Sequence, residues 1–280
     1  MIQPLLKCLV GLSLIKGLDG CVAPEQSPPF VYPQNRTVST PQGIPCDSAT
    51  NYFPTEAALN PKRVKPRDKN PEVLDERSLD CQFNFEFASQ CLYAFKAPVL
   101  SNYFLGNSIY RFVWLRSFHR PALLTLRCTA TGGTLQTQFL NKEPGMTVPG
   151  IVDPDEPGIS SVEHQRRVKY KQRVLADSEY QASIAFAKLP VVVEDESTTS
   201  VSPMQVQRFQ QMLAQANFSK MPSCEPKLEF DGAYWLLEAH EPGSYSVVGR
   251  QSPDKEYSSR FRRCCDFLLD LSAAKMEERY

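Results

Sequence analysis

The segment IYRFVWLRSFH, residues 109–119, is rich in aromatic and β-branched side chains. Side chains of these kinds favour the pleated surface of a β-strand. Two further segments of the same character follow, ALLTLRC at 122–128 and TLQTQFLN at 134–141, and Gly132 and Gly133 separate them. Because glycine pairs are typical of tight turns between strands, this region predicts three consecutive strands of an antiparallel meander.

Two helices and a hairpin are predicted after the meander. Ser202, Pro203 and Gln205 form a capping box with proline at the first helical position, which predicts a helix with one buried apolar stripe. The segments AYWLLEAH and YSVVGR flank a four-residue turn at 241–244 and predict a hairpin. A last helix is predicted over 260–274. The separation of strands from helices indicates an α+β fold, with an antiparallel sheet and helices packed on one face.

Four other segments receive the following interpretations. CQFNFEF at 81–87 alternates apolar and polar residues and predicts a strand or an extended edge. RRVKYKQRVL at 166–175 predicts a half-exposed strand with a basic outer face, and a polyanion-binding site is the alternative. The acidic and hydroxyl-rich EDESTTS at 194–200 predicts a loop, as do the prolines and glycines of 143–158.

The first 21 residues have the pattern of an export signal. Lys7 precedes a short apolar core at 8–15, which resembles a secretory signal peptide. Gly20 followed by Cys21 resembles the lipobox of bacterial lipoproteins, in which the cysteine is acylated. We therefore expect residues 1–21 to be a signal peptide and Cys21 to be the site of lipidation, with the lipid anchoring the chain to a membrane.

The next region predicts a tether. Residues 22–46 are proline-rich, and residues 60–77 carry mixed charge with two prolines, so neither stretch favours a helix or a buried strand. We expect a proline-rich and charged tether or loop over 22–78 and a single α+β domain over 79–280. Val22, directly after the lipidated cysteine, favours the outer membrane in proteins with this signal.

Two stretches resemble a family of exported bacterial proteins without an established activity, including lipoproteins. They are NYFLGNSIYRFVWLRSFHRP at 102–121 and DGAYWLLEAHEPGSYSVVGRQSP at 231–253, together with FLLDLS in the last helix. The similarity covers residues 100–275. The resemblance implies the same kind of domain and a cell-envelope setting, and it implies no catalytic or binding residues.

Composition excludes several classes of function. The chain has 280 residues, with 31 basic and 31 acidic side chains, and therefore lacks the positive charge with which nucleic-acid binders neutralise phosphates. No segment after the N-terminus is a membrane span by length and hydropathy. The sequence has no GxSxG, no phosphate-binding glycine loop and no HExxH. We therefore expect no cofactor and no nucleic-acid partner.

The cysteines predict disulfides rather than a metal site. None forms a CxxC, and the three histidines lie far from any cysteine pair, so we expect no metal. In an exported chain cysteines pair, and the odd number left after Cys21 leaves at least one unpaired within a monomer. A bond from Cys264 or Cys265 to Cys224 is one hypothesis. The candidates are Cys46, Cys81, Cys91, Cys128, Cys224, Cys264 and Cys265.

A weak catalytic constellation is the alternative to a non-enzymatic domain. His119 ends the aromatic strand near Arg116, and Glu238 and His240 share one face of a later strand, so a carboxylate could orient an imidazole. Glu238 could equally pair with Arg250 across the hairpin. We expect a non-enzymatic lipoprotein or periplasmic domain that binds a protein or another envelope component. The alternative is an exported hydrolase-like enzyme that uses His119, Glu238 and His240.

Overall fold

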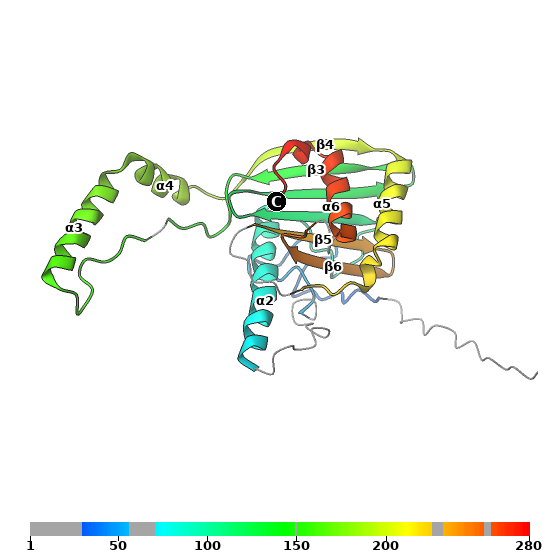
Figure 1. The fold of residues 1–280 in the computed structure, drawn as a ribbon. Coiled ribbons are helices and arrows are strands. Elements are labelled where there is room, and N and C mark those ends of the chain that lie inside the picture. Colours follow the sequence, from blue (N-terminus) through cyan, green and yellow to red (C-terminus); the bar gives the residue numbers. More distant parts are fainter. Residues whose placement is uncertain (1–29, 56–70, 149, 226–231, 255–258) are drawn as a thin grey trace, which may run out of the picture.

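The computed structural model describes residues 30–55, 71–148, 150–225, 232–254 and 259–280. The expected signal peptide, Cys21 and the first residues of the expected tether lie outside the described residues. The ribbon in Figure 1 shows one sheet with helices packed against it and a helical arm that projects away from it.

Six antiparallel strands form a single sheet in the order β4-β3-β2-β1-β5-β6, and the α+β class is confirmed. The three-strand meander and the later hairpin both form at the expected places. β1 and β5 pair at the centre of the sheet, and nearly all of their residues are buried, because both faces are covered. The strands are β1 (Ile109–Arg116), β2 (His119–Thr129), β3 (Gly132–Leu140), β4 (Val193–Val201), β5 (Ala233–Glu241) and β6 (Ser244–Gln251).

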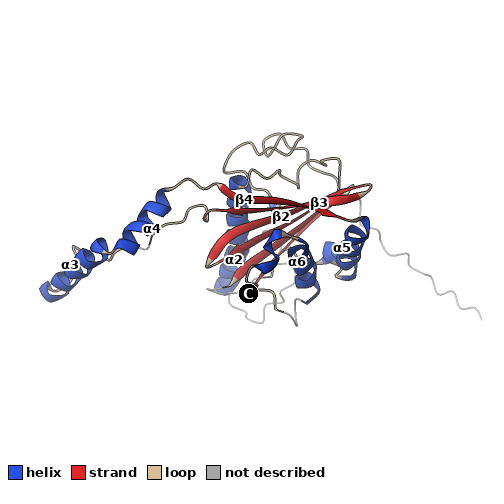
Figure 2. Cartoon of the chain, turned by 90° about the horizontal axis from the view of Figure 1, so that it is seen from above, coloured by secondary structure: helices blue, strands red, loops and turns tan. Residues whose placement is uncertain are grey.

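Two helices cover one face of the sheet, α5 (Pro203–Gln215) and α6 (Ser259–Leu271). α5 begins with the capping box predicted from its sequence, with Ser202 as the N-cap. Its buried stripe packs with α6 against Trp114 and Trp235. Figure 2 shows both helices on the same side of the strands. Short 3-10 helices follow each of them, η1 (Phe218–Lys220) and η2 (Ala273–Met276).

The opposite face is covered by α2 (Pro71–Ala94), where the sequence predicted a strand over 81–87. That prediction is wrong, because the apolar residues of this short stretch divide between two sides of a helix, with Cys81 and Phe85 toward the core and Phe83 outward. The buried residues continue past it at spacings of three and four, and Phe83 is 67% exposed on the outer side. The inward positions are Cys81, Phe85, Ala88 and Leu92.

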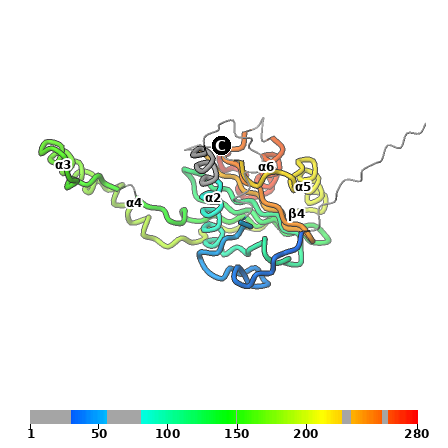
Figure 3. Tube along the Cα trace, turned by 90° about the horizontal axis from the view of Figure 1, so that it is seen from below, coloured from blue at the N-terminus to red at the C-terminus, as the bar shows by residue number. Residues whose placement is uncertain are grey.

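Residues 30–55 lie on the same face as α2, as Figure 3 shows. This part of the proline-rich region differs from the spacer that its composition predicts, because its aromatic side chains are buried while its prolines remain in loops. The Tyr32 and Tyr52 side chains enter the core, and the Tyr52 hydroxyl donates to the carbonyl of Ala97. The folded body therefore begins before residue 79, and position 79 lies inside α2.

The connection between β3 and β4 contains α3 (Ser161–Ala176) and α4 (Ser178–Lys188). We call residues 141–192 the arm; neither of its helices has a buried residue, and Figures 1 and 2 show them projecting from the body. The predicted strand at 166–175 is wrong, since Ser160 caps a helix there. The predicted loop at 194–200 is also wrong, because pairing with β3 draws this polar segment into the sheet as its edge strand.

No helix in the described part of the chain is both long and apolar enough to cross a membrane.

Candidate functional site

The residues of the catalytic alternative lie at opposite ends of the sheet. His119 is paired with Arg116 at one end of β1, and His240 is paired with Ile109 at the other end. At about 3.3 Å per residue, the seven residue steps of β1 between these pairs span roughly 23 Å. The structure therefore brings Glu238 and His240 near each other in the sheet but does not bring His119 to them.

Glu238 is a fully buried structural carboxylate. Its Oε2 accepts from Nε of Arg111 at 2.5 Å, and its Oε1 accepts from the hydroxyl of Tyr245 at 2.8 Å. The expected bridge to Arg250 is wrong, because the strand register places Arg250 opposite Trp235 and not opposite Glu238. Arg250 instead contacts Glu225 at 3.2 Å. Both oxygens of Glu238 are thus occupied inside the protein.

His240 holds the loop 100–105 against the sheet. Its Nε2 accepts from the backbone N–H of Leu105 at 3.1 Å, which leaves the proton on Nδ1. Nδ1 lies 2.8 Å from the carbonyl of Leu100 and 2.9 Å from the hydroxyl of Tyr32. Burial lowers the pKa of His240 below its usual 6.5. Since both ring nitrogens are engaged, the ring positions backbone and has no free atom for acid–base chemistry.

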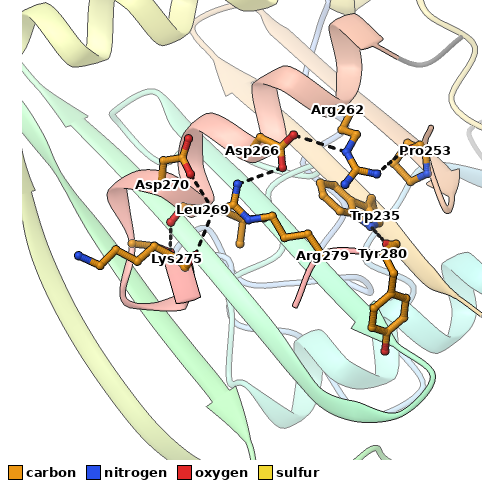
Figure 4. Close-up of polar contacts among 10 residues, drawn as sticks. Trp235, Pro253, Arg262, Asp266, Leu269, Asp270, Lys275, Arg279 and Tyr280 are labelled. Atoms are coloured by element: carbon orange, nitrogen blue, oxygen red, sulfur yellow. Dashed lines mark hydrogen bonds and ion pairs between the residues drawn. The ribbon is translucent and has the colours of Figure 1, made fainter. Parts of the chain in front are cut away.

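The chain's C-terminal segment closes the end of the sheet where His119 lies. His119 contacts the Tyr280 hydroxyl at 2.9 Å, and the Tyr280 carbonyl accepts from the indole of Trp235 at 3.3 Å. Figure 4 shows how this end is filled: Arg262 lies over Trp235, while Arg279 reaches two carboxylates of α6. The guanidinium of Arg116 pairs with Glu277 at 2.7 Å.

Cys81 and Cys224 form a disulfide that joins α2 to the segment beside β6. The hypothesis that Cys224 pairs with the last helix is wrong, since Cys264 and Cys265 are buried on the opposite face of the sheet. In the described residues no group of histidine, cysteine and carboxylate side chains is arranged to hold a metal ion. The other described cysteines are unpaired: Cys46 is exposed, and Cys91, Cys128, Cys264 and Cys265 are buried.

A cavity of about 1100 Å³ opens on the face that carries α2. Three segments that are distant in sequence form most of its walls: the loop 41–45, the C-terminal end of α2 with residues 96–98, and the loop at 104–105. Arg127 of β2 and Val191 at the base of the arm complete them. Most of the residues that line it are apolar, as in most small-molecule sites. The apolar contributors include Pro41, Ile44, Tyr93, Ala97, Pro98 and Phe104.

Two cations, Lys96 and Arg127, are the charged residues of the cavity wall, and both are partly in contact with solvent because the cavity is open. Among the described residues neither side chain has a hydrogen bond or an ion pair, and no carboxylate lines the cavity. Desolvation at the wall, and secondarily the neighbouring Arg111, lower the pKa of Arg127. An anion at this position would offset both effects.

Lys96 occupies a backbone position that usually belongs to glycine. It has φ of +54°, its N–H donates to the carbonyl of Tyr93, and the N–H of Ala97 donates to the carbonyl of Leu92. This is the Schellman arrangement, whose left-handed residue is most often glycine. A lysine there costs about 1 kcal/mol of backbone strain. Lys96 also lines the cavity. A role of its side chain there would explain why this strained position is a lysine and not a glycine.

The buried network under the cavity fixes its walls. Nη1 of Arg111 donates to the carbonyl of Pro98 at 2.5 Å, and His240 fixes the loop that carries Phe104. Gly43 has φ of +80° and lies so close to the second wall that an added Cβ would be 2.8 Å from Pro98. The residues predicted as catalytic, Glu238 and His240, therefore support this cavity from beneath.

Comparison with protein-family models, with curated proteins and with solved structures found no match for this chain. The cavity residues were also missed by sequence reasoning, because no motif links segments so far apart. One signal was available in the sequence: Lys96 stands at the position after α2 where a helix usually has glycine. That signal can be recognised only if residues 71–94 are first predicted to be a helix.

Proposed function

We propose that this protein is a non-enzymatic binding domain of the cell envelope, and that its cavity binds a small molecule with an apolar body and an anionic group. The observation that carries the proposal is a large apolar cavity whose charged residues are two cations without partners. Apolar walls with a few polar groups that fix orientation are typical of ligand sites.

The charge of the cavity selects the ligand class. Lys96 and Arg127 offer charge-assisted hydrogen bonds to a carboxylate, sulfate or phosphate, and because both side chains are exposed such bonds contribute about 0.5–1.5 kcal/mol each. Pro41, Ile44 and Phe104 offer contacts to an alkyl chain or ring system. A fully polar anion would leave these walls wet, whereas a neutral apolar molecule would leave both cations without a partner.

Binding of dodecanoate, measured by titration calorimetry and compared with that of dodecanol, tests the ligand class. We expect dodecanoate to bind more tightly than the alcohol, and Lys96→Gln or Arg127→Gln to weaken dodecanoate binding about two- to tenfold each. Lys220→Gln, which removes an exposed charge away from the cavity, is the matched control. Equal affinity for the acid and the alcohol, or equal binding by all variants, would contradict the proposal.

The envelope setting is part of the same proposal. The signal-like residues 1–21, with lipidation at Cys21, and the resemblance to exported proteins support it, and the Cys81–Cys224 disulfide fits an oxidising compartment. Intact mass of the protein from a membrane fraction, with and without reductant, tests it. We expect removal of the residues before Cys21, an acyl mass, and a gain of two hydrogens on reduction. Full-length mass with no disulfide would refute export.

A further inference from the structure

The arm presents a stripe of cations and apolar side chains on its outer surface. Val162, Arg166, Lys169, Tyr170 and Arg173 follow one another at helical spacings of four, three, one and three, so they share one side of α3, and all five are exposed. Val162 is 77% exposed, and the Arg166 side chain is 83% exposed. We call these five residues the α3 stripe.

The inner side of α3 is occupied differently. Arg167 pairs with Glu156 at 2.5 Å and with Glu163 at 3.1 Å, and His164 contacts Asp155 at 3.2 Å. The local carboxylates thus pair with Arg167 and His164, whereas Lys171 on this side has no ion pair among the described residues. On the stripe, Arg166 has only a 3.6 Å contact with Glu163, and Arg173 lies over the Tyr170 ring.

The arm lacks the packing that normally stabilises helices of its length. Isolated helices shorter than about 12–15 residues are marginal in water, and tertiary packing usually supplies most helical stability. α3 and α4 have 16 and 11 residues and no buried side chain, although Lys142 donates to the carbonyls of Phe186 and Ala187 at the base. A surface that covers the stripe would supply the missing contacts.

We infer that the α3 stripe docks on an anionic phospholipid surface. Helices that lie on membranes combine Lys and Arg, which attract headgroups, with aromatic and aliphatic side chains that enter the interface. The stripe has three cations beside Val162 and Tyr170, and Figures 1 and 2 show α3 held clear of the body, where a flat surface can reach it.

The composition of the stripe favours a lipid surface over a protein partner. The centres of protein interfaces are depleted in lysine and rich in buried apolar residues, whereas cations outnumber apolar side chains on the stripe. Nucleic acid would engage the cations of the stripe but would leave the exposed aliphatic side chain of Val162 without a contact. This inference is independent of the cavity, whose cations lie on the body.

Vesicle flotation with the full-length chain tests the inference, with Cys21→Ser present in every sample so that no acyl group contributes. We expect binding to vesicles of phosphatidylcholine with phosphatidylglycerol, weak binding to phosphatidylcholine alone, and loss of binding in high salt. Each cation near the surface contributes about 1 kcal/mol, or roughly fivefold, so Arg166→Gln/Lys169→Gln/Arg173→Gln should reduce partitioning about a hundredfold.

The matched control is Arg36→Gln/Lys220→Gln/Lys275→Gln, which changes net charge equally at exposed positions of the body. We expect it to bind as the parent chain does, and Tyr170→Ser to bind more weakly than the parent. Circular dichroism checks that each variant folds. Equal loss in both triple variants, equal binding to neutral vesicles, or stronger binding to polyglutamate or single-stranded DNA than to the anionic vesicles would overturn the inference. Cavity binding of dodecanoate should be unchanged in the stripe variant.

Discussion

At one end of the paired strands β1 and β5, Arg116 and His119 lie beneath the C-terminal segment and have partners there. At the other end, Lys96 and Arg127 face a cavity of about 1100 Å³ without a partner among the described residues. Both ends contain cations and a histidine. The ends differ in whether their cations have partners and not in which reactive residue types they contain, and this difference is why we propose ligand binding at the cavity.

The largest contrast between the two ends is expected in the stability of their ion pairs. Glu238→Gln leaves the fully buried Arg111 without a counter-charge and should cost about 3–5 kcal/mol of unfolding free energy. Glu277→Gln, which removes the partly exposed partner of the buried Arg116, should cost less, about 1–3 kcal/mol, because this carboxylate is already partly solvated in the folded protein. Urea unfolding of the two variants measures both values. Equal losses would remove the distinction between the ends.

A pH dependence should be specific to the cavity end. Because burial lowers the pKa of folded His240, the unfolded chain takes up a proton first as the pH falls below about 6.5. The contribution of neutral His240 to the free energy of unfolding is complete above that pH. As the pH falls, this contribution declines by up to about 1.4 kcal/mol per pH unit until the pKa of folded His240 is reached. His240→Gln should flatten this part of the profile in urea unfolding at pH 5 to 7.5. If the unfolding free energy of that variant kept the same dependence on pH, the titrating group would be a residue other than His240.

The smallest expected effect comes from replacing Lys96, which should raise the stability of the protein and lower its affinity for the ligand. Lys96→Gly relieves the left-handed strain at the end of α2 and should stabilise the protein by up to about 1 kcal/mol. The same variant should weaken dodecanoate binding, because a cavity cation is lost. Thermal unfolding and calorimetry on the one variant check both directions. A destabilised variant, or one with unchanged affinity, would show that the lysine is not retained for the cavity.

Strong local signals made half of the fold predictable. The glycine turn after β2 and the capping box at Ser202 act over a few residues, so the meander and α5 were predicted correctly. α2, α3 and β4 were not. In 81–87 and 166–175 the alternation of apolar and polar residues is too short to exclude a helix that carries apolar residues on more than one side. β4 is a strand because it pairs with β3.

The site was less predictable than the fold. Glu238 and His240 were identified from their residue types, yet burial assigned them to supporting roles under the cavity. Lys96 and Arg127 carry no motif, and they meet only because α2 ends where β2 passes beneath the loop 41–45. Long-range packing of this kind leaves no pattern in a single sequence.

The base of the arm has a consequence for how the chain can be modified. Asn141 and Val192 face each other there, with the N–H of Asn141 donating to the carbonyl of Val192 at 3.0 Å and the side-chain oxygen of Asn141 accepting in return. The β3–β4 hairpin therefore closes at its root, and the arm is topologically one very long hairpin loop. Closing about 50 residues in place of about four costs only about 2 kcal/mol of chain entropy. The sheet can therefore accept a shortened, lengthened or replaced arm as an exchangeable module.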